Sequence, residues 1–247
     1  MPIKTIFNYS PNFNSKKRLK KGIKFIIFHY TGMKNENSAI KRLTNMQSEV
    51  GAHYFVKNNG EIITMIPELY IAWHAGLSCW KHHKYLNNNS IGIEISNAGH
   101  KHGYKNFTKK QISSIKKLSL FLIKKYKISK RCILGHSDIA PERKKDPGEK
   151  FPWKFLAKNN IGIWHSKKKD ILIKLRKKTL DTNDKEKFLI NLKKIGYQSK
   201  EIITKDKKNF EKLLTLAFQR RFRPELVNGV VDEECLIISQ NLIKIQF

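Results

Sequence analysis

Apolar segments of strand-like composition alternate along this chain with helical patterns, and that alternation restricts the fold more than any other feature. Residues 24–31, KFIIFHYT, form an apolar run behind basic residues and predict a buried strand. Residues 52–67 predict a hairpin around an Asn-Asn-Gly turn, and residues 90–96, SIGIEIS, predict another strand. Residues 108–127 carry apolar side chains near a 3.6-residue period behind Thr108 and predict an amphipathic helix. Strands mixed with covering helices indicate a layered α/β domain.

The pattern changes near residue 165, where a charged segment without strand signals predicts a linker or a peripheral helix. Three segments with helical apolar spacing follow, and Asp232 is a good N-cap for the last of them. We therefore expect a first domain over residues 1–180, with its core at about 20–160, and a small three-helix domain over 181–247. The first domain also has a predicted short helix over residues 37–46, with Asn37 or Ser38 as its N-cap. The three predicted helices of the second domain cover residues 188–197, 209–222 and 232–243.

The formal net charge is +30, from 50 lysine and arginine residues against 20 acidic residues. Such a field attracts polyanions in general, including nucleic acid, anionic lipid and carboxylate-rich cell-wall fragments. Only 8 of the 50 cations are arginine, whereas proteins that read base edges usually rely on arginine forks. A lysine-rich bias spread over solvated faces explains the charge more simply, and no nucleic-acid-binding motif accompanies it. We therefore expect no specific nucleic-acid partner.

Cysteine usage and the start of the sequence bear on the compartment. No apolar run approaches the ~18–20 residues that span a bilayer, so we expect no transmembrane segment. The first residues lack the apolar core of a secretory signal. Cys79, Cys132 and Cys235 are far apart and odd in number, which disfavours a disulfide framework. These features favour the cytoplasm, and the periplasm or cell envelope is the alternative.

Residues 135–148, GHSDIAPERKKDPG, concentrate groups that can bind a metal or move a proton in a segment whose prolines disfavour a long helix. His136 and Asp146 flank a turn that contains two prolines, so both side chains can face the same point. His29 lies inside the predicted strand 24–31, where a buried imidazole needs a partner. A catalytic zinc site takes three nitrogen or oxygen donors and leaves one position for water. The three residues suit such a set, although a lone strand histidine is more often a hydrogen-bonded core residue.

Five segments, in order, resemble the zinc-dependent N-acetylmuramoyl-L-alanine amidases of the type-2 fold, which bacteriophage amidases and peptidoglycan recognition proteins share: FIIFHYTG, AHYFVKNNGEI, AWHAG, SIGIEI and GHSDIAPERKKDPG. The resemblance covers about residues 20–160 and implies a mixed central β-sheet flanked by helices. Nearer the C-terminus, AFQRRFRP and NGVVDEECL resemble the small helical peptidoglycan-binding domain often attached to such enzymes. The implied activity is hydrolysis of the amide between N-acetylmuramic acid and L-alanine in peptidoglycan or muropeptides.

Carried over by position, the resemblance also implies roles for individual residues. Glu94 corresponds to the general base and acid, and Lys144 to the cation that stabilises the oxyanion. A carboxylate in an apolar strand loses its hydration unless it has a partner or a function, which agrees with this role for Glu94. Glu142 departs from the family, in which a small residue is common there, but it removes no metal donor. The implied ligands of one Zn²⁺ per chain are His29, His136 and Asp146.

Three further residues are candidates for substrate binding. His53 matches a histidine common in the family, although a structural hydrogen-bonding role explains it at least as well. The segment AWHAG places Trp73 and His74 on a predicted rim loop, where an aromatic face can stack on a sugar or a stem peptide. Plain loop packing is the alternative for both residues.

The main alternative function is a non-catalytic peptidoglycan receptor on the same fold. Receptors of that kind typically lack a complete ligand set, whereas all three ligand positions carry suitable residues here. The sequence leaves the substrate open among intact wall, soluble turnover fragments and their 1,6-anhydro forms. It also leaves the stem-peptide specificity and the oligomeric state open.

Overall fold

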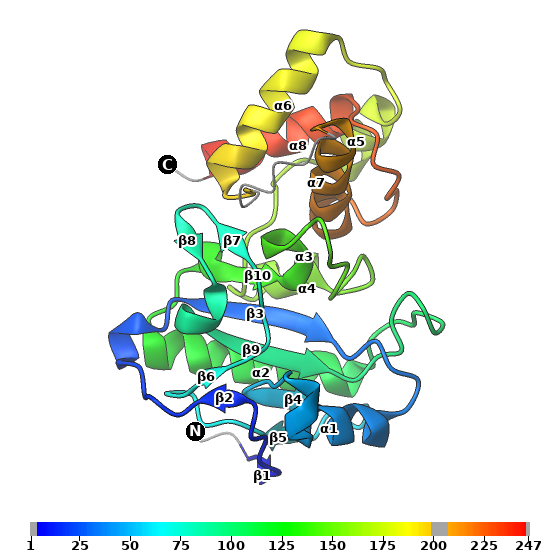
Figure 1. Ribbon diagram of the computed structural model, residues 1–247. Helices are drawn as coiled ribbons and strands as arrows, with labels where there is room; N and C mark the ends of the chain where they lie inside the picture. Colours follow the sequence, from blue (N-terminus) through cyan, green and yellow to red (C-terminus); the bar gives the residue numbers. More distant parts are fainter. Residues whose placement is uncertain (1–3, 199–206, 246–247) are drawn as a thin grey trace.

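The apolar segment at 24–31 forms strand β3, the second strand from one edge of a six-stranded sheet (Figure 1). The computed structural model describes residues 4–198 and 207–245. The strand order is β1-β5-β4-β9-β3-β10, in which β4 and β5 are antiparallel and all other neighbours are parallel. The predicted mixed central sheet is therefore confirmed. Its strands are β1 (Ile6–Phe7), β3 (Phe25–Tyr30), β4 (Tyr54–Val56), β5 (Ile62–Thr64), β9 (Ser90–Ile95) and β10 (Ile133–Gly135).

Helices cover both faces of this sheet. Helix α2 (Lys109–Tyr126) begins at Thr108, whose hydroxyl accepts from the Gln111 amide while the Gln111 side chain reaches back to the Thr108 amide. The apolar stripe of α2 packs on one face of β3 and β9, and α1 (Glu36–Thr44) packs on the other face, against β4 and β5. Alternate residues of β3 therefore point to opposite layers, with His29 on the face away from α2.

Shorter elements connect these layers. Two small antiparallel pairs, β2 with β6 and β7 with β8, flank the main sheet, and α3 and α4 follow β10. These elements are β2 (Phe13–Asn14), β6 (Ile71–Ala72), β7 (Cys79–Trp80), β8 (His83–Lys84), α3 (His136–Ile139) and α4 (Trp153–Lys158), with 3₁₀ turns at Lys20–Gly22, Met46–Ser48, Leu86–Asn89 and Lys130–Cys132.

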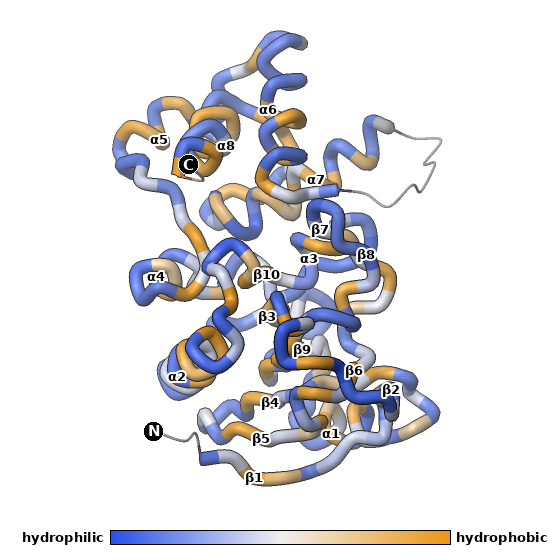
Figure 2. The backbone as a smooth tube through the Cα atoms, turned by 90° about the vertical axis from the view of Figure 1, so that its left-hand side faces the viewer, coloured by the Kyte–Doolittle hydropathy of each residue, from blue (hydrophilic) through white to orange (hydrophobic). Residues whose placement is uncertain are grey.

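Four further helices, which we call the helical unit, lie beyond the β10 edge of the sheet (Figure 1). Helices α5 and α6 both pack against α8. Apolar residues of the unit pack in one core with Phe25, Ile27 and Leu134 of the sheet. Figure 2 shows apolar positions recurring along the helices of the unit and along the strands of the sheet. Helix α5 lies in the segment predicted as a linker or peripheral helix, and it packs with the other helices of the unit. The helices are α5 (Lys169–Leu175), α6 (Thr182–Ile195), α7 (Lys207–Phe222) and α8 (Glu233–Lys244).

Two predicted helix starts were wrong. Helix α1 is capped by Asn35, whose side chain accepts from the Ser38 amide, rather than by Asn37 or Ser38. Helix α6 begins at Thr182, after the cap Asp181, rather than at 188, because its first turns are polar and carry no apolar period. Asp232 caps α8 as predicted. None of the helices within residues 4–198 and 207–245 is both long enough and apolar enough to cross a membrane.

Candidate active site

The register between β3 and β9 sets His29 beside Glu94. The two residues are direct partners in the parallel pair, so their side chains project from the same face of the sheet. On that strand, Ile91, Ile93 and Ile95 pack toward α2, which leaves Ser90, Gly92 and Glu94 on the opposite face. Alternation along both strands thus delivers an imidazole and a carboxylate to one surface.

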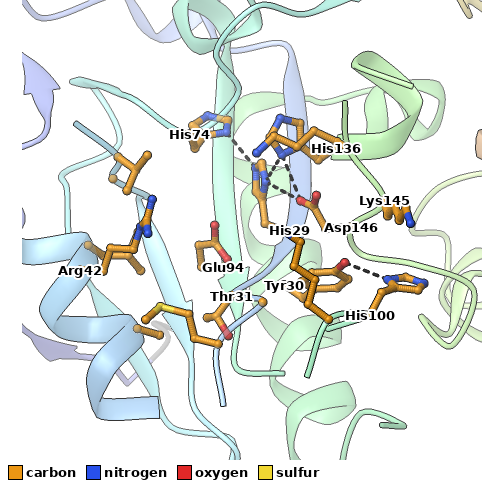
Figure 3. Close-up of a pocket in the computed structure, with 18 of the residues that line it drawn as sticks. His29, Tyr30, Thr31, Arg42, His74, Glu94, His100, His136, Lys145 and Asp146 are labelled. Carbon is orange, nitrogen blue, oxygen red and sulfur yellow. Dashed lines mark hydrogen bonds and ion pairs between the residues drawn. The ribbon is translucent and has the colours of Figure 1, made fainter. Parts of the chain in front are cut away.

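The turn after β10 brings two further donors to the same place. His136 is the first residue of α3, and Asp146 lies at the end of the proline-containing segment that returns to it. His29 Nδ1 is 2.9 Å from His136 Nδ1 and 3.1 Å from Asp146 Oδ2, and His136 Nδ1 is 3.0 Å from that oxygen. Figure 3 shows the three side chains pointing toward one another. The structure therefore brings together the three residues that the sequence singled out as ligands.

Hydrogen bonds behind His29 assign its tautomer. Ser90 Oγ donates its single proton to the Leu86 carbonyl at 2.5 Å, so it accepts from His74 Nε2, 3.0 Å away. His74 Nδ1 is then an acceptor, and it receives the Nε2 proton of His29 at 3.0 Å. His29 Nδ1 consequently carries a lone pair rather than a proton. Gly92 makes this arrangement possible, because a β-carbon there would lie 2.4 Å from the His74 ring.

His136 is oriented in the same way. Its Nε2 lies 3.1 Å from the Ala75 carbonyl, which can only accept, and 3.4 Å from Arg143 Nη2, which can only donate. The shorter contact favours a proton on Nε2 and a lone pair on Nδ1. Burial lowers the pKa of both His29 and His136 below the ordinary value, and both rings are neutral near pH 7. Two nitrogen lone pairs and a carboxylate oxygen therefore converge on one point with no proton among them. A cation satisfies this arrangement, and imidazole with carboxylate is a donor set that suits zinc.

Glu94 is a half-buried carboxylate at the floor of this site, and one of its two oxygens is buried. Within the described part of the chain, its Oε2 is inaccessible and has no hydrogen-bond partner. Burial raises the pKa of Glu94 to about 7, against the opposing effects of nearby His29 and Lys144. A carboxyl group with such a pKa can both accept and release a proton near neutrality.

A cavity of about 480 Å³ opens over this cluster, and cations surround its rim. Lys144, the predicted oxyanion partner, lines it two residues before Asp146 and is half-buried. Figure 3 shows Arg42 on one side of the cavity and Lys145 on the other. The remaining basic side chains in the lining are His100, Lys101 and Arg143.

Two structural roles were not predicted from the sequence: the contacts of Arg143, and the link that His74 makes between His29 and Ser90. The Arg143 guanidinium donates to the carbonyls of Ala75 and Leu77, which ties the 136–146 segment to the AWHAG loop. In the sequence, Arg143 is the single arginine in the run ERKK, and that change of residue type was the available signal. The rim residue Arg42, on α1, has no such signal.

The placement of His53 corrects its interpretation as a substrate-binding residue. His53 has 0% exposed surface and does not line the cavity. Its Nδ1 accepts from the Gly92 amide at 3.0 Å, and its Nε2 lies 3.0 Å from the Tyr70 carbonyl. It therefore joins β9 to the loop before β6, which is the structural role that the sequence left as the alternative.

Because His53 is buried, we expect acidification to lower the unfolding free energy of wild-type protein more than that of the His53→Gln variant. Burial, reinforced by the Arg18 charge, lowers the pKa of His53 to about 3. The folded pKa lies below the unfolded value, so the unfolded state takes up a proton first and stability falls as the pH drops below about 6.5. Between pH 7 and 5 we expect wild-type protein to lose about 2 kcal/mol more unfolding free energy than the glutamine variant. Urea unfolding at both pH values measures this difference, and equal losses would show that His53 does not cause it.

Trp73 and His74 occupy different positions although they are adjacent in sequence. Trp73 is half-buried at the cavity wall, and its indole donates to Asn14 Oδ1 at 2.6 Å. His74 also lines the cavity, as predicted for this loop, but it is only 8% exposed and lies beneath His29. Its two ring nitrogens are occupied by His29 and Ser90, which gives it an orienting role rather than a stacking one.

Comparison with known proteins identifies the family. A family model described as N-acetylmuramoyl-L-alanine amidase matches residues 19–149. N-acetylmuramoyl-L-alanine amidase AmiD of Escherichia coli (strain K12) is 34% identical over 234 residues, which are 90% of this chain and 83% of that protein. The structure of E. coli AmiD in complex with anhydro-N-acetylmuramic acid-L-Ala-D-γ-Glu-L-Lys matches with a TM-score of 0.79, covering 90% of this chain and 89% of the other. AmpDh3 from Pseudomonas aeruginosa, 28% identical, matches with a TM-score of 0.78 and covers 98% of each chain. The fold, the converging donors and these matches agree, and the chain belongs to the N-acetylmuramoyl-L-alanine amidase family of enzymes.

Proposed function

We propose that this protein is a zinc hydrolase that cleaves the amide between the lactyl group of N-acetylmuramic acid and the L-alanine of the stem peptide. The observation that carries the proposal is the pairing of a proton-free donor triangle with Glu94 on the adjacent strand, whose buried Oε2 has no hydrogen-bond partner among the described residues. Burying a carboxylate oxygen without a partner costs free energy, so the stability of the fold does not explain why Glu94 stands at this position. The residues proposed to hold one zinc ion are His29, His136 and Asp146.

Zinc, when bound there, acts as a Lewis acid and makes water a nucleophile at neutral pH. Glu94 takes the proton of the attacking water as the oxygen bonds to the carbonyl carbon. Lys144 supplies positive charge to the oxyanion that forms when the carbonyl π-bond opens. Glu94 then returns the proton to the amide nitrogen as the carbon–nitrogen bond breaks, so the L-alanine leaves as a neutral amine. The products are a lactyl carboxylic acid and a free stem peptide.

The cavity and its rim support a peptidoglycan fragment as the substrate. Muropeptides carry carboxylates along the stem, and the rim side chains Arg42, Lys101 and Lys145 are cationic. The structure of the relative AmiD holds an anhydro-N-acetylmuramic acid tripeptide, described there as its substrate. We propose the same class of peptidoglycan fragment here, with the helical unit as a contact for polymer because AFQRRFRP and NGVVDEECL resemble a wall-binding domain.

Mass spectrometry of the products tests this function. Purified protein is incubated with anhydro-muropeptides and with intact sacculi, each with zinc and with a chelator. We expect release of free stem peptide starting at L-alanine, and none in the chelated samples. Binding of muropeptide without any cleavage would instead favour the non-catalytic receptor.

The Lys144→Met variant tests the oxyanion role. We expect the barrier to rise by about 3–4 kcal/mol, as is typical when such a group is lost, with zinc content unchanged. Lys145→Met is the matched control, because Lys145 also lines the cavity but is exposed and adjacent in sequence. Steady-state kinetics of the two variants decide the point, and an equal loss in both would indicate a general charge effect rather than a specific one.

A further inference from the structure

The one-turn helix that presents His136 is held in place by side chains from the helical unit. Helix α3 has only four residues, and a helix of that length has little stability of its own. It begins at His136, and the next amide, of Ser137, donates to the Asp146 carbonyl at 2.8 Å. The position of α3 therefore sets the positions of two proposed zinc ligands together.

Asp138 on α3 is the attachment point. Its Oδ1 accepts from the Tyr197 hydroxyl at 2.6 Å, and its Oδ2 accepts from Arg221 Nη1 at 2.5 Å. Oδ2 also accepts from the Gly135 amide at 2.7 Å, immediately before His136. All these groups are buried, with 1% of the Asp138 side chain and 3% of the Arg221 side chain exposed. A buried carboxylate with three donors is a rigid connection.

Arg221 extends the connection to the sheet. Its Nη2 donates to the Ile133 carbonyl at 2.9 Å, on the outer edge of β10, and its guanidinium lies 4.3 Å from the Trp153 ring centre. Tyr197 in turn packs its ring against Trp80 of β7. Figure 1 shows α3 and β10 between the rest of the sheet and α7.

From these contacts we infer that the helical unit is part of the catalytic scaffold, and that Tyr197 and Arg221 are positioning residues that act on His136 through Asp138. The segment AFQRRFRP, singled out for its resemblance to a wall-binding domain, contributes Arg221 to this buried cluster. Its use in the scaffold is separate from any contact with polymer. The inference rests on the proposed zinc site.

The test measures zinc affinity and metal geometry rather than turnover. We expect Tyr197→Phe and Arg221→Gln to weaken zinc binding about 10–100-fold, which is typical for partners behind metal ligands, and to shift the visible spectrum of the cobalt-substituted protein. Arg223→Gln is the matched control, because Arg223 is equally buried and ion-paired, but with Asp232 and Glu234 inside the helical unit. It should lower the melting temperature while leaving zinc affinity and the cobalt spectrum at wild-type values.

Two outcomes would overturn the inference: wild-type zinc affinity and spectrum in both Tyr197→Phe and Arg221→Gln, or an equal change in Arg223→Gln. Should Arg221→Gln not fold, Tyr197→Phe alone decides, since it removes only one hydroxyl. Wild-type protein that binds no zinc would contradict the proposed function instead. In that case, amide hydrogen exchange over residues 136–146 in metal-free protein tests the positioning role without zinc. Exchange should be faster than in wild-type protein in the Tyr197 and Arg221 variants but not in the Arg223 control.

Discussion

Glutamine in place of Glu94 is expected to lower turnover about 10²–10⁴-fold while zinc stays bound at one ion per chain. The amide has nearly the shape of the carboxylate but cannot take the proton from water or return it to the leaving nitrogen. Because Glu94 lies on the strand beside the proposed ligand His29 and outside the donor triangle, metal binding should survive. Two measurements on the same preparation check this prediction: the rate of muropeptide cleavage should fall, and the zinc content should stay at one ion per chain.

A stability measurement separates this effect from damage to the fold. Burial raises the pKa of Glu94 to about 7, so above that pH the wild-type protein holds an ionised carboxylate with one buried oxygen that has no hydrogen-bond partner among the described residues. The metal-free glutamine variant should be at least as stable as wild-type protein at pH 8, since it removes that charge. Glu142→Gln, in the neighbouring loop, should keep nearly wild-type turnover. Full activity of Glu94→Gln would refute the assignment of the base.

Removal of the metal is expected to lower turnover as much as the Glu94→Gln substitution does, or more. Chelation should lower turnover at least about 10³-fold, because a Lewis acid contributes several kcal/mol to such a barrier, and added zinc should restore it. His136→Ala should behave like the chelated enzyme and bind less than one zinc per chain. His100→Ala is the control, since His100 lines the same cavity outside the donor triangle.

Metal analysis and kinetics before and after chelation provide the measurement. An enzyme that keeps its turnover at a zinc content near zero would contradict the proposed mechanism. Loss of zinc in His100→Ala to the same extent as in His136→Ala would show that the ligand set is different from the one proposed.

Local sequence patterns predicted most strands and helices of the layered domain correctly, and individual elements show why. In β3, residues alternate between two apolar layers, so His29 had to share a face with Phe25 and Ile27. Helix α2 was predicted nearly to the residue, because its 3.6-residue period and its Thr108 cap are both local signals. The start of α6 was missed for the converse reason, since its first turns are polar and mostly exposed, and only the Asp181 cap marks where the helix begins.

The sequence by itself determined which side chains have the chemistry for a metal-dependent hydrolase, because residue type and strand alternation are local properties. It also indicated, through ordered motifs, the family to which the chain belongs. Only the tertiary structure decided that Glu94 lies beside His29, that the His74 ring packs over Gly92 behind His29, and that Tyr197 and Arg221 donate to Asp138. These contacts join residues far apart in the chain, and their geometry depends on strand register and helix docking, which no local pattern encodes.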